Sequence, residues 1–340
     1  MQSEKYSRDN AGQSLKKYIL LKQGELAYNH GASKAKQFGC CYELTEPEAR
    51  IPYVYHCFKI NEHEYTPYIA MTLNNPKMDK QLKRLVSSSV RMDGLLNISF
   101  EDYMSVSLHL PSTNEQKRIA NFIQKIDERI VAQEKLLASL KKYKRGLLSN
   151  LFGEKAAQKW TTKSYYFSEI AQRRNKKYDP TSGIEYPCVE LDNIEQETGK
   201  ILSTVPSTAQ SSIKNIAMSG DTLFGKLRPY LRKYAFAQKT MACSSEIWAL
   251  IPSDVVLPKF LFYLVQTEQF LRVANISSGT KMPRAEWSNI EKAEFFIPDL
   301  FVQRKIVFLL ERLDQKITFA DSALFCLNRL NASLLQQLFI

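Results

Sequence analysis

The sequence predicts an α+β protein in which two mixed α/β domains are separated by two long coiled-coil helices. Three observations lead to this fold class. One segment occurs twice without a gap, both copies carry a heptad pattern of apolar residues, and the chain between the copies consists of short apolar runs broken by turn residues. We therefore expect a first domain at 1–110, a long helix at 111–155, a second domain at 156–297 and a second long helix at 298–340.

The repeat starts at a proline in both copies. Pro298 follows Pro111 by 187 residues (298 − 111), and this offset holds without a gap to the C-terminus. Gln116–Ile119 (QKRI) in the first copy corresponds to Gln303–Ile306 (QRKI) in the second. Chance does not give this register, so the chain contains a duplicated unit.

Both copies also carry a helix-start signal. Ser112 and Glu115 match the S-x-x-E capping box, and Asp299 is a residue type that caps helix N-termini. A helix from about Glu115 to Phe152 would be roughly 55 Å long at about 1.5 Å per residue. Such a helix is too long to pack inside one small domain. We expect such a helix to act as a spacer.

The heptad pattern places apolar residues at the a and d positions of both helices. The predicted helix–helix seam consists of Ile119, Ile123, Ile126, Ile130, Leu137, Leu140, Leu147 and Leu151 in the first helix and Ile306, Leu310, Leu313, Ile317, Leu324, Leu327, Leu334 and Leu338 in the second. A polar residue interrupts both seams at the same place, Lys144 and Asn331, which restricts register and suggests that the two helices contact each other. Heptads alone would equally fit an ordinary dimerisation helix.

The chain between the helices predicts mixed α and β structure. Short apolar and aromatic runs are expected as strands at 186–189, 222–224, 234–236 and 247–251. Pro258–Val273 has helical periodicity and is expected to pack beside the sheet, and Thr66–Leu85 is the equivalent segment in the first half.

The charge of the chain favours a polyanionic partner. Lys and Arg number 47 against 35 Asp and Glu, and the net charge is +12. Basic and aromatic residues interleave around Pro229, which predicts a loop whose cations contact phosphates or guanine edges, while two further segments, 173–177 and 277–281, are weaker candidates. The predicted DNA-binding residues are Lys226, Arg228, Tyr230, Arg232, Lys233, Arg173, Arg174, Lys176, Lys177, Ser278, Gly279 and Lys281. The alternative is a solvated basic hairpin that contacts no DNA.

Cysteine spacing and hydropathy argue against a metal site and against a membrane segment. The six cysteines show no CxxC spacing and no grouping with histidine, so we expect no bound metal and reduced thiols. The N-terminus is polar, and no run of about 18 apolar residues occurs. These features predict a cytoplasmic protein without a membrane partner.

Three motifs imitate catalytic sites, and each fails. Gly220–Leu227 matches the phosphate-binding pattern G-x-x-x-x-G-K, but Leu227 stands where Ser or Thr should bind magnesium. Asp299 and Asp314 imitate a metal-dependent nuclease motif, but both belong to the repeated helix segment. Asn75–Lys77 lacks the aromatic residue on which an amino-methyltransferase stacks a flipped base. We therefore expect no catalytic residue in this chain.

The duplicated segment resembles the conserved region of type I restriction-modification specificity subunits. The resemblance is carried by Leu110–Asp127 (LPSTNEQKRIANFIQKID) and by the helix end Lys144–Phe152 (KRGLLSNLF). Gly220–Tyr230 resembles a stretch common in the target recognition domains of that family, and Gly24–Asn29 is its counterpart in the first half. The resemblance covers nearly the whole chain.

The resemblance implies a non-catalytic DNA specificity subunit with two target recognition domains. Each domain would read one half of a bipartite DNA sequence, and two antiparallel helices would hold the domains apart. By the same resemblance, the chain binds double-stranded DNA, docks two modification (methyltransferase) subunits and then recruits restriction subunits. S-adenosylmethionine, ATP and magnesium would belong to those partners, so no cofactor is expected in this chain.

The first recognition domain departs from the family pattern. Only 23 residues precede Gly24, whereas its counterpart Gly220 lies 60 residues after Trp160 (220 − 160), so we expect the first domain to be incomplete at its N-terminal side. DNA reading is therefore assigned mainly to the second half. Two alternatives stay open, a single-chain restriction or modification enzyme and a coiled-coil scaffold without DNA specificity.

Overall fold

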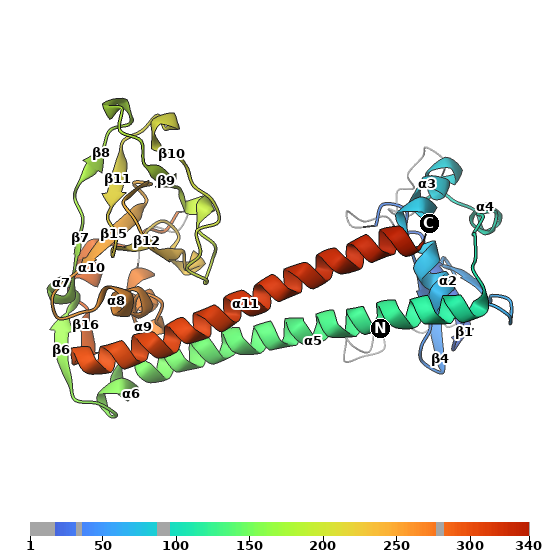
Figure 1. Ribbon diagram of the computed structural model, residues 1–340, viewed down its shortest axis with the longest axis horizontal. Helices are drawn as coiled ribbons and strands as arrows, with labels where there is room; N and C mark the ends of the chain where they lie inside the picture. Colours follow the sequence, from blue (N-terminus) through green and yellow to red (C-terminus); the bar gives the residue numbers. More distant parts are fainter. Residues whose placement is uncertain (1–17, 32–35, 87–95, 277–281, 340) are drawn as a thin grey trace. The chain divides into compact units, whose positions relative to one another are not determined.

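The computed structural model describes residues 18–31, 36–86, 96–276 and 282–339 of the 340-residue chain (Figure 1). The chain divides into two compact units. The first unit comprises 1–135 with 322–340, and the second unit comprises 136–321. Each unit contains one mixed α/β domain together with a part of both long helices.

The two long helices are α5 (Thr113–Leu151) and α11 (Leu300–Leu338), each 39 residues long. Asp299 caps α11 as expected, because its Oδ1 accepts a hydrogen bond from the backbone N–H of Val302 at 2.8 Å. Near the start of α5, the backbone N–H of Gln116 donates to the carbonyl of Ser112 at 2.9 Å. Both helices thus begin two residues after the repeated proline.

All sixteen residues of the predicted seam are buried or half-buried. In the second unit, Ile306 near the start of α11 belongs to the same hydrophobic cluster as Leu151 at the end of α5. In the first unit, Ala120 near the start of α5 shares a cluster with Phe339, which follows α11. Within each unit, the two helix segments therefore run antiparallel.

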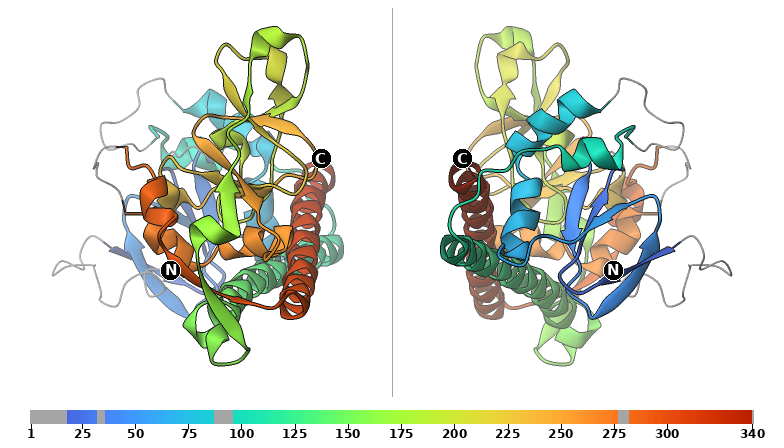
Figure 2. Two further views of the ribbon diagram at one scale, coloured as in Figure 1. Left: turned by 90° about the vertical axis from the view of Figure 1, so that its left-hand side faces the viewer. Right: turned by 90° about the vertical axis from the view of Figure 1, so that its right-hand side faces the viewer.

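The second unit contains a four-stranded and a five-stranded sheet. The four-stranded sheet is antiparallel, in the order β13 (Tyr234–Phe236), β12 (Thr222–Gly225), β15 (Ile247–Pro252) and β7 (Ala171–Arg173). The five-stranded sheet has the order β10 (Val205–Pro206), β9 (Pro187–Val189), β14 (Met241–Cys243), β11 (Lys214–Ala217) and β8 (Lys177–Tyr178), and β14 and β9 pair in parallel. In Figure 2 (left) the five-stranded sheet forms the projecting tip of this unit. The predicted strands at 186–189, 222–224, 234–236 and 247–251 are confirmed, each within one residue at either end.

The four-stranded sheet forms the middle layer of the second unit. Leu223 of β12 packs in a cluster with Val189 of the five-stranded sheet. The next residue, Phe224, points to the opposite face and contacts Phe270, with 5.0 Å between the ring centroids. The helices on that face and around it are α6 (Glu154–Ala157), α7 (Phe167–Ile170), α8 (Pro258–Leu264), α9 (Glu268–Ala274) and α10 (Trp287–Ile290), and a two-stranded sheet joins β6 (Thr162–Tyr166) to β16 (Glu294–Pro298).

The prediction of one helix over Pro258–Val273 is wrong in one respect, because the segment forms two helices. The hydroxyl of Thr267 accepts a hydrogen bond from the backbone N–H of Phe270 at 3.3 Å, so Thr267 caps α9 and ends the run of α8. The equivalent segment of the first unit breaks in the same way. Asn75 caps α3 (Pro76–Leu85) after α2 (Thr66–Leu73), and its Oδ1 accepts from two backbone N–H groups at 2.7 and 3.0 Å.

The first unit has a smaller β structure. Three antiparallel strands have the order β3 (Cys40–Glu43), β2 (Leu26–Asn29) and β5 (His56–Phe58), and β1 (Tyr18–Lys22) pairs with β4 (Glu48–Pro52). A short helix, α4 (Phe100–Met104), brings Tyr103 onto Tyr28, with 3.9 Å between the stacked ring centroids. Burial raises the pKa of both phenols, which keeps them protonated.

The strands on both sides of each central strand confirm the counterpart relationship between Gly24–Asn29 and Gly220–Gly225. Gly24 precedes β2 and Gly220 precedes β12, with φ of 80° and 94°, a region that favours glycine. The carboxylates of Glu25 and Asp221 each accept a hydrogen bond at 2.8 Å from the backbone N–H three residues earlier. The sheet β3-β2-β5 thus corresponds to β13-β12-β15.

None of the helices in the described part of the chain combines the length and apolar character that crossing a bilayer requires.

Candidate nucleic-acid interface

The segment before β13 is a tight turn, in agreement with the loop that Pro229 predicted. β12 and β13 form a hairpin whose connection contains a 3-10 turn at Pro229–Leu231. Arg228 and Arg232 flank this turn with φ of 52° and 51°, a left-handed conformation that is rare for residues other than glycine. Arg228 and Tyr230 are exposed, and Lys226 is half-buried. Such backbone strain is often found at binding sites.

The hairpin is joined to a second segment, 282–287. The backbone N–H of Arg228 donates to the carbonyl of Pro283 at 2.8 Å, and Leu227 and Arg284 form a β-bridge. The backbone N–H of Ala285 donates to the carbonyl of Lys226, also at 2.8 Å. These two backbone hydrogen bonds flank the bridge between Leu227 and Arg284 and fix the two segments side by side.

Arg284 is an interface candidate that was missed in the sequence. Its guanidinium is held by the Glu246 carboxylate, with Nε and one terminal nitrogen donating at 3.0 and 3.3 Å. Its side chain is 48% exposed, so the rest of the guanidinium faces solvent. Glu246 lies 38 residues before Arg284 and the arginine stands outside any basic run, so no local pattern pointed to it.

Arg173 joins the same region through the aromatic residues beneath it. Its guanidinium carbon lies 4.7 Å from the ring centroid of Trp287 and 6.0 Å from that of Trp248. Trp287 ends the 282–287 segment that carries Arg284. We refer to Arg173, Lys226, Arg228, Tyr230 and Arg284 as the basic surface.

Other predicted DNA-binding residues are engaged within the second unit. Arg232 pairs with Glu268 at 2.8 Å and with Glu197 at 3.5 Å. Lys233 donates from Nζ to the carbonyl of Leu191 at 2.6 Å. These two side chains therefore brace the hairpin against neighbouring elements.

Arg174 is bound in the same manner. It forms a two-point ion pair with Asp221, which is 2% exposed, with Nε and a terminal nitrogen donating at 2.6 and 2.8 Å. The hydrogen bond to the carboxylate raises the pKa of Arg174 and keeps it charged. Lys177 donates to the side-chain oxygen of Asn215 at 2.6 Å, while Lys176 is exposed. Ser278, Gly279 and Lys281 lie outside the described residues.

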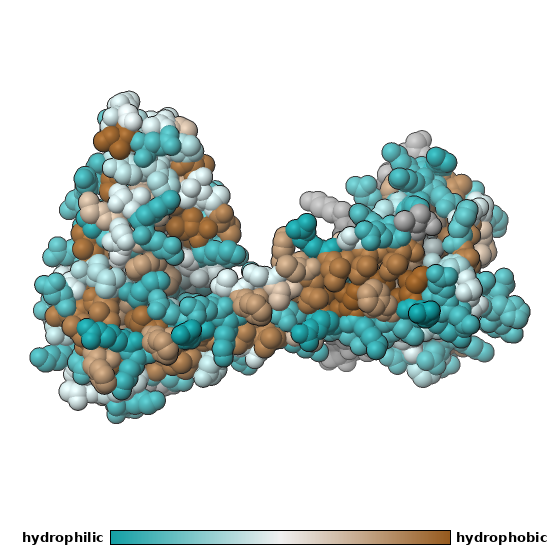
Figure 3. All heavy atoms as spheres, in the orientation of Figure 1, coloured by the Kyte–Doolittle hydropathy of each residue, from teal (hydrophilic) through white to brown (hydrophobic). Residues whose placement is uncertain are grey.

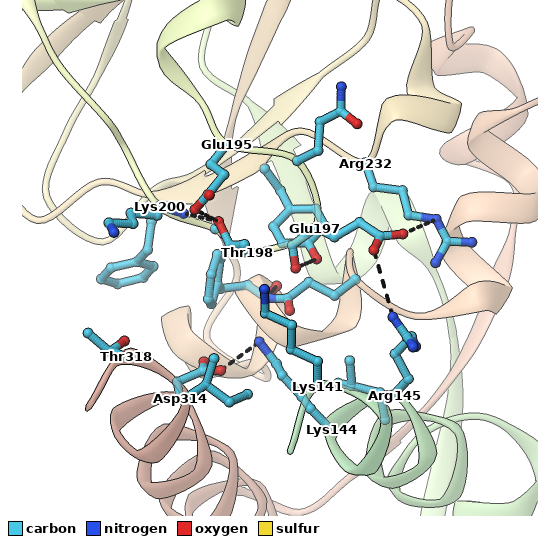
Figure 4. Close-up of a pocket in the computed structure, with 18 of the residues that line it drawn as sticks. Lys141, Lys144, Arg145, Glu195, Glu197, Thr198, Lys200, Arg232, Asp314 and Thr318 are labelled. Atoms are coloured by element: carbon cyan, nitrogen blue, oxygen red, sulfur yellow. Dashed lines mark hydrogen bonds and ion pairs between the residues drawn. The ribbon is translucent and has the colours of Figure 1, made fainter. Parts of the chain in front are cut away.

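A pocket of about 470 Å³ lies in the second unit beside the long helices (Figure 4). Its walls are the loop 195–200 and the facing parts of α5 and α11. Most of the charges that line it pair with one another, as Arg145 does with Glu197 at 3.8 Å and Lys144 with Asp314 at 2.7 Å. Such mutual neutralisation disfavours a phosphate ligand, so this pocket adds nothing to the basic surface.

No arrangement for metal chemistry is evident in the ranges that the structure describes. Within them, no three His, Cys, Asp or Glu side chains come together as metal ligands would. His30, which is 4% exposed, faces two backbone carbonyls, those of Leu96 and Val54, at 3.0 and 2.6 Å. This histidine is therefore occupied in the packing of the first unit.

Large apolar side chains are exposed along α11. Phe301, Phe308 and Phe319 are 62%, 62% and 78% exposed in the second unit, and Phe325 is 62% exposed in the first. Figure 3 shows apolar surface extending along this helix. Exposed aromatic side chains of this size are typical of interaction surfaces.

Comparison with known sequences identifies relatives for much of the chain. Residues 163–322 match the family model of the type I restriction modification DNA specificity domain. The type I restriction enzyme HindI specificity subunit of Haemophilus influenzae is 28% identical over 175 residues, which are 46% of this chain and 36% of that protein. The type I restriction enzyme EcoDI specificity subunit of Escherichia coli is 24% identical over 282 residues, 70% of this chain and 62% of that protein. The chain thus matches less than two thirds of the length of either relative.

Two solved structures share the fold. One comes from a study of complex assembly and conformational transition of the type I R-M system, with a TM-score of 0.58, 16% identity and coverage of 94% of this chain and 82% of that chain. The other is the S subunit of a type I restriction-modification system from M. genitalium, with a TM-score of 0.54, 15% identity and coverage of 98% and 86%. Together with the sheets and paired helices, these matches confirm the predicted fold class. Residues 163–322 are thus similar to the type I restriction modification DNA specificity domain, over a little less than half of the chain.

Proposed function

We propose that the chain is a sequence-specific DNA-binding specificity subunit of a type I restriction-modification complex and that it is not itself an enzyme. The observation that carries this proposal is the basic surface, in a chain of net charge +12. Two of its three exposed arginines, Arg228 and Arg284, lie on two hydrogen-bonded segments, and the third, Arg173, lies over Trp287 of one of them. The family match covers the domain that carries this surface.

The geometry of the basic surface suits base reading as well as phosphate contact. The carboxylate of Glu246 fixes the plane of the Arg284 guanidinium, and the turn fixes the backbone of Arg228. A pre-oriented guanidinium loses less conformational entropy when it binds guanine through two parallel hydrogen bonds. We assign Arg284 and Arg228 to base edges, and Lys226 and Arg173 to phosphates.

The partners follow from the family and from the exposed face of α11. We propose that this face docks modification methyltransferase subunits, two per chain because the helix unit is duplicated, and that restriction subunits join that assembly. S-adenosylmethionine, ATP and magnesium would then be bound by the partners, and the complex would act on DNA in the cytoplasm.

The test measures DNA binding by the full chain assembled with its modification subunit. Selection from a random duplex library should enrich one sequence, and Arg284→Ala should weaken binding to it about 5- to 150-fold, the range of about 1–3 kcal/mol for one bidentate base contact. Lys239→Ala, which removes an exposed charge from the turn after β13, is the matched control and should change affinity less than about threefold.

Three outcomes would contradict the proposal. Equal affinity for every duplex would favour a coiled-coil scaffold. Methylation or cleavage of DNA by the isolated chain would favour a single-chain enzyme. An Arg284→Ala variant that binds the enriched duplex as tightly as the parent would remove the basic surface from DNA recognition.

A further inference from the structure

The glutamine of the repeated QKRI and QRKI segments is completely buried in both copies. Gln116 and Gln303 are each 0% exposed, although they stand in the first turn of long helices whose neighbouring residues are exposed. A buried primary amide is costly unless its donors and its acceptor are all hydrogen-bonded. The partners of the two amides therefore show what each glutamine holds.

Gln303 joins the long helix to the recognition domain of the second unit. Its Oε1 accepts a hydrogen bond at 2.8 Å from the backbone N–H of Leu257, which occupies the N-cap position of α8. Its Nε2 donates to the carbonyl of Val255 at 2.8 Å and to that of Pro298 at 2.9 Å. The N–H partner requires an oxygen and the carbonyls require N–H groups, so these partners determine the orientation of the amide.

Gln116 makes two of the same three contacts in the first unit, and its third partner is a carboxylate in place of a backbone carbonyl. Its Oε1 accepts a hydrogen bond at 3.0 Å from the backbone N–H of Tyr65, which occupies the N-cap position of α2. Its Nε2 donates to the carbonyl of Pro111 at 2.9 Å and to the carboxylate of Glu64. Two copies of a glutamine thus bind the start of two equivalent helices through the same atoms.

In each unit, the helix that the glutamine binds (α8 or α2) also contacts the C-terminal end of the other long helix. In the second unit, Phe152, which follows α5, contacts Phe260 of α8 with 4.8 Å between the ring centroids. In the first unit, Phe339, which follows α11, contacts Tyr68 of α2 at 5.2 Å. Phe152 and Phe339 correspond in the repeat, so α8 and α2 are each fixed at one point on each long helix.

We propose that Gln116 and Gln303 are positioning residues that fix the direction of each recognition domain on its long helix, and thereby the spacing that the chain accepts between two DNA half-sites. The link to spacing rests on the proposed function, whereas the link to domain direction does not. A hydrophobic contact such as Phe152 with Phe260 permits sliding, but three hydrogen bonds to one planar amide do not.

The first arm of the test uses no DNA. Spin labels are placed through noncanonical amino acids at Lys239 in the recognition domain and at Lys316 on α11, both exposed in the second unit. The parent chain should give one narrow distance distribution, and Gln303→Met should at least double its width. Gln315→Met, at an exposed position on the same helix, is the matched control and should leave the width unchanged.

A variant that fails to fold is replaced by Gln303→Glu. The carboxylate of Q303E keeps the acceptor for Leu257 and loses both donors, so the distribution should still widen. A width equal to that of the parent in either folded variant, checked by circular dichroism, overturns the proposal.

The second arm selects DNA from a library with random half-sites and variable spacers, on the full chain with its modification subunit. The parent should enrich one spacing, and Gln303→Met should also accept spacings one base pair shorter and longer while enriching the same half-sites. A widened spin-label distribution with an unchanged spacing preference would overturn the link between these glutamines and spacing.

Discussion

Lys144 of α5 and Asp314 of α11 form an ion pair in the second unit, with 2.7 Å between Nζ and Oδ1. Asp314 also accepts a hydrogen bond from the hydroxyl of Tyr263 at 2.9 Å. In the first unit, the corresponding residues of the repeat form the corresponding contact, since Asn331 donates to Asp127 at 2.8 Å. The two polar residues that interrupt the heptads therefore do not face each other. Each of them contacts the aspartate of the other helix, which fixes the register in both units.

Replacing Lys144 by methionine should destabilise the second unit. The Lys144 side chain is 9% exposed, and its replacement would leave Asp314 without its counter-charge. Loss of one partner of a buried pair costs about 3–5 kcal/mol, and we expect about 2–3 kcal/mol because the Asp314 side chain is 31% exposed. Chemical denaturation measures the free energy of unfolding.

The control for this change is Lys142→Met at an exposed position on the same helix, which should alter the free energy of unfolding by less than about 0.5 kcal/mol. Equal losses for K144M and K142M would show that the ion pair does not hold the helices in register.

Replacing Asp221 by asparagine should loosen the turn before β12. Asp221 is 2% exposed, binds Arg174 at two points and accepts the backbone N–H of Met218 at 2.8 Å. Asparagine keeps one acceptor but leaves the arginine charge without a partner, so we expect a loss of about 2–4 kcal/mol in the free energy of unfolding. The exposed Asp254→Asn serves as control, and a loss no greater than the control's would assign Arg174 to another role.

Replacing Gly39 by alanine should destabilise the first unit far more than the same change at Gly24. Both glycines have positive φ, 79° and 80°, so the backbone strain is shared. A Cβ at Gly39 would clash with the backbone carbonyl oxygen of Asn29, whereas a Cβ at Gly24 would meet nothing within 4 Å. We expect about 1 kcal/mol for Gly24→Ala and at least about 2 kcal/mol more for Gly39→Ala. Equal melting temperatures for the two variants would contradict the close approach.

The buried thiol of Cys243 should resist alkylation until the second unit unfolds. Burial raises its pKa from 9.0 to about 12, so at pH 8 the reactive thiolate is suppressed, whereas Cys326 is exposed. A raised pKa favours the protonated thiol in the folded state. Its contribution to stability is therefore complete below pH 9 and is lost as the pH rises towards 12. Mass spectrometry after iodoacetamide treatment at pH 8 should find Cys326 modified first, and equal rates at both cysteines would contradict this burial.

The long helices and their starts could be predicted from sequence because those signals are local. Heptad periodicity and the cap at Asp299 depend on residues within one or two turns. The break between α8 and α9 was missed because apolar residues keep a helical spacing on both sides of the polar residues Gln266–Gln269. There, a single capping hydroxyl, that of Thr267, outweighs the periodicity.

The candidate site was only partly visible in the sequence because contacts between distant residues decide which cations face solvent. Arg232 belongs to the same basic run as Arg228, yet Glu197 and Glu268 bind it within the unit. Arg284 belongs to no run, and a β-bridge to Leu227 brings it into the basic surface. Which residues read bases and which read phosphates stays a prediction.

DNA sequence recognition by this chain is tested by selection of DNA from a random duplex library by the full chain assembled with its modification subunit, repeated at rising salt concentration. We expect one enriched sequence, with affinity that falls as salt rises and a salt dependence that becomes about one counterion weaker for Arg173→Ala. No enrichment, with equal binding to every duplex at each salt concentration, would contradict the assignment of this chain to DNA sequence recognition.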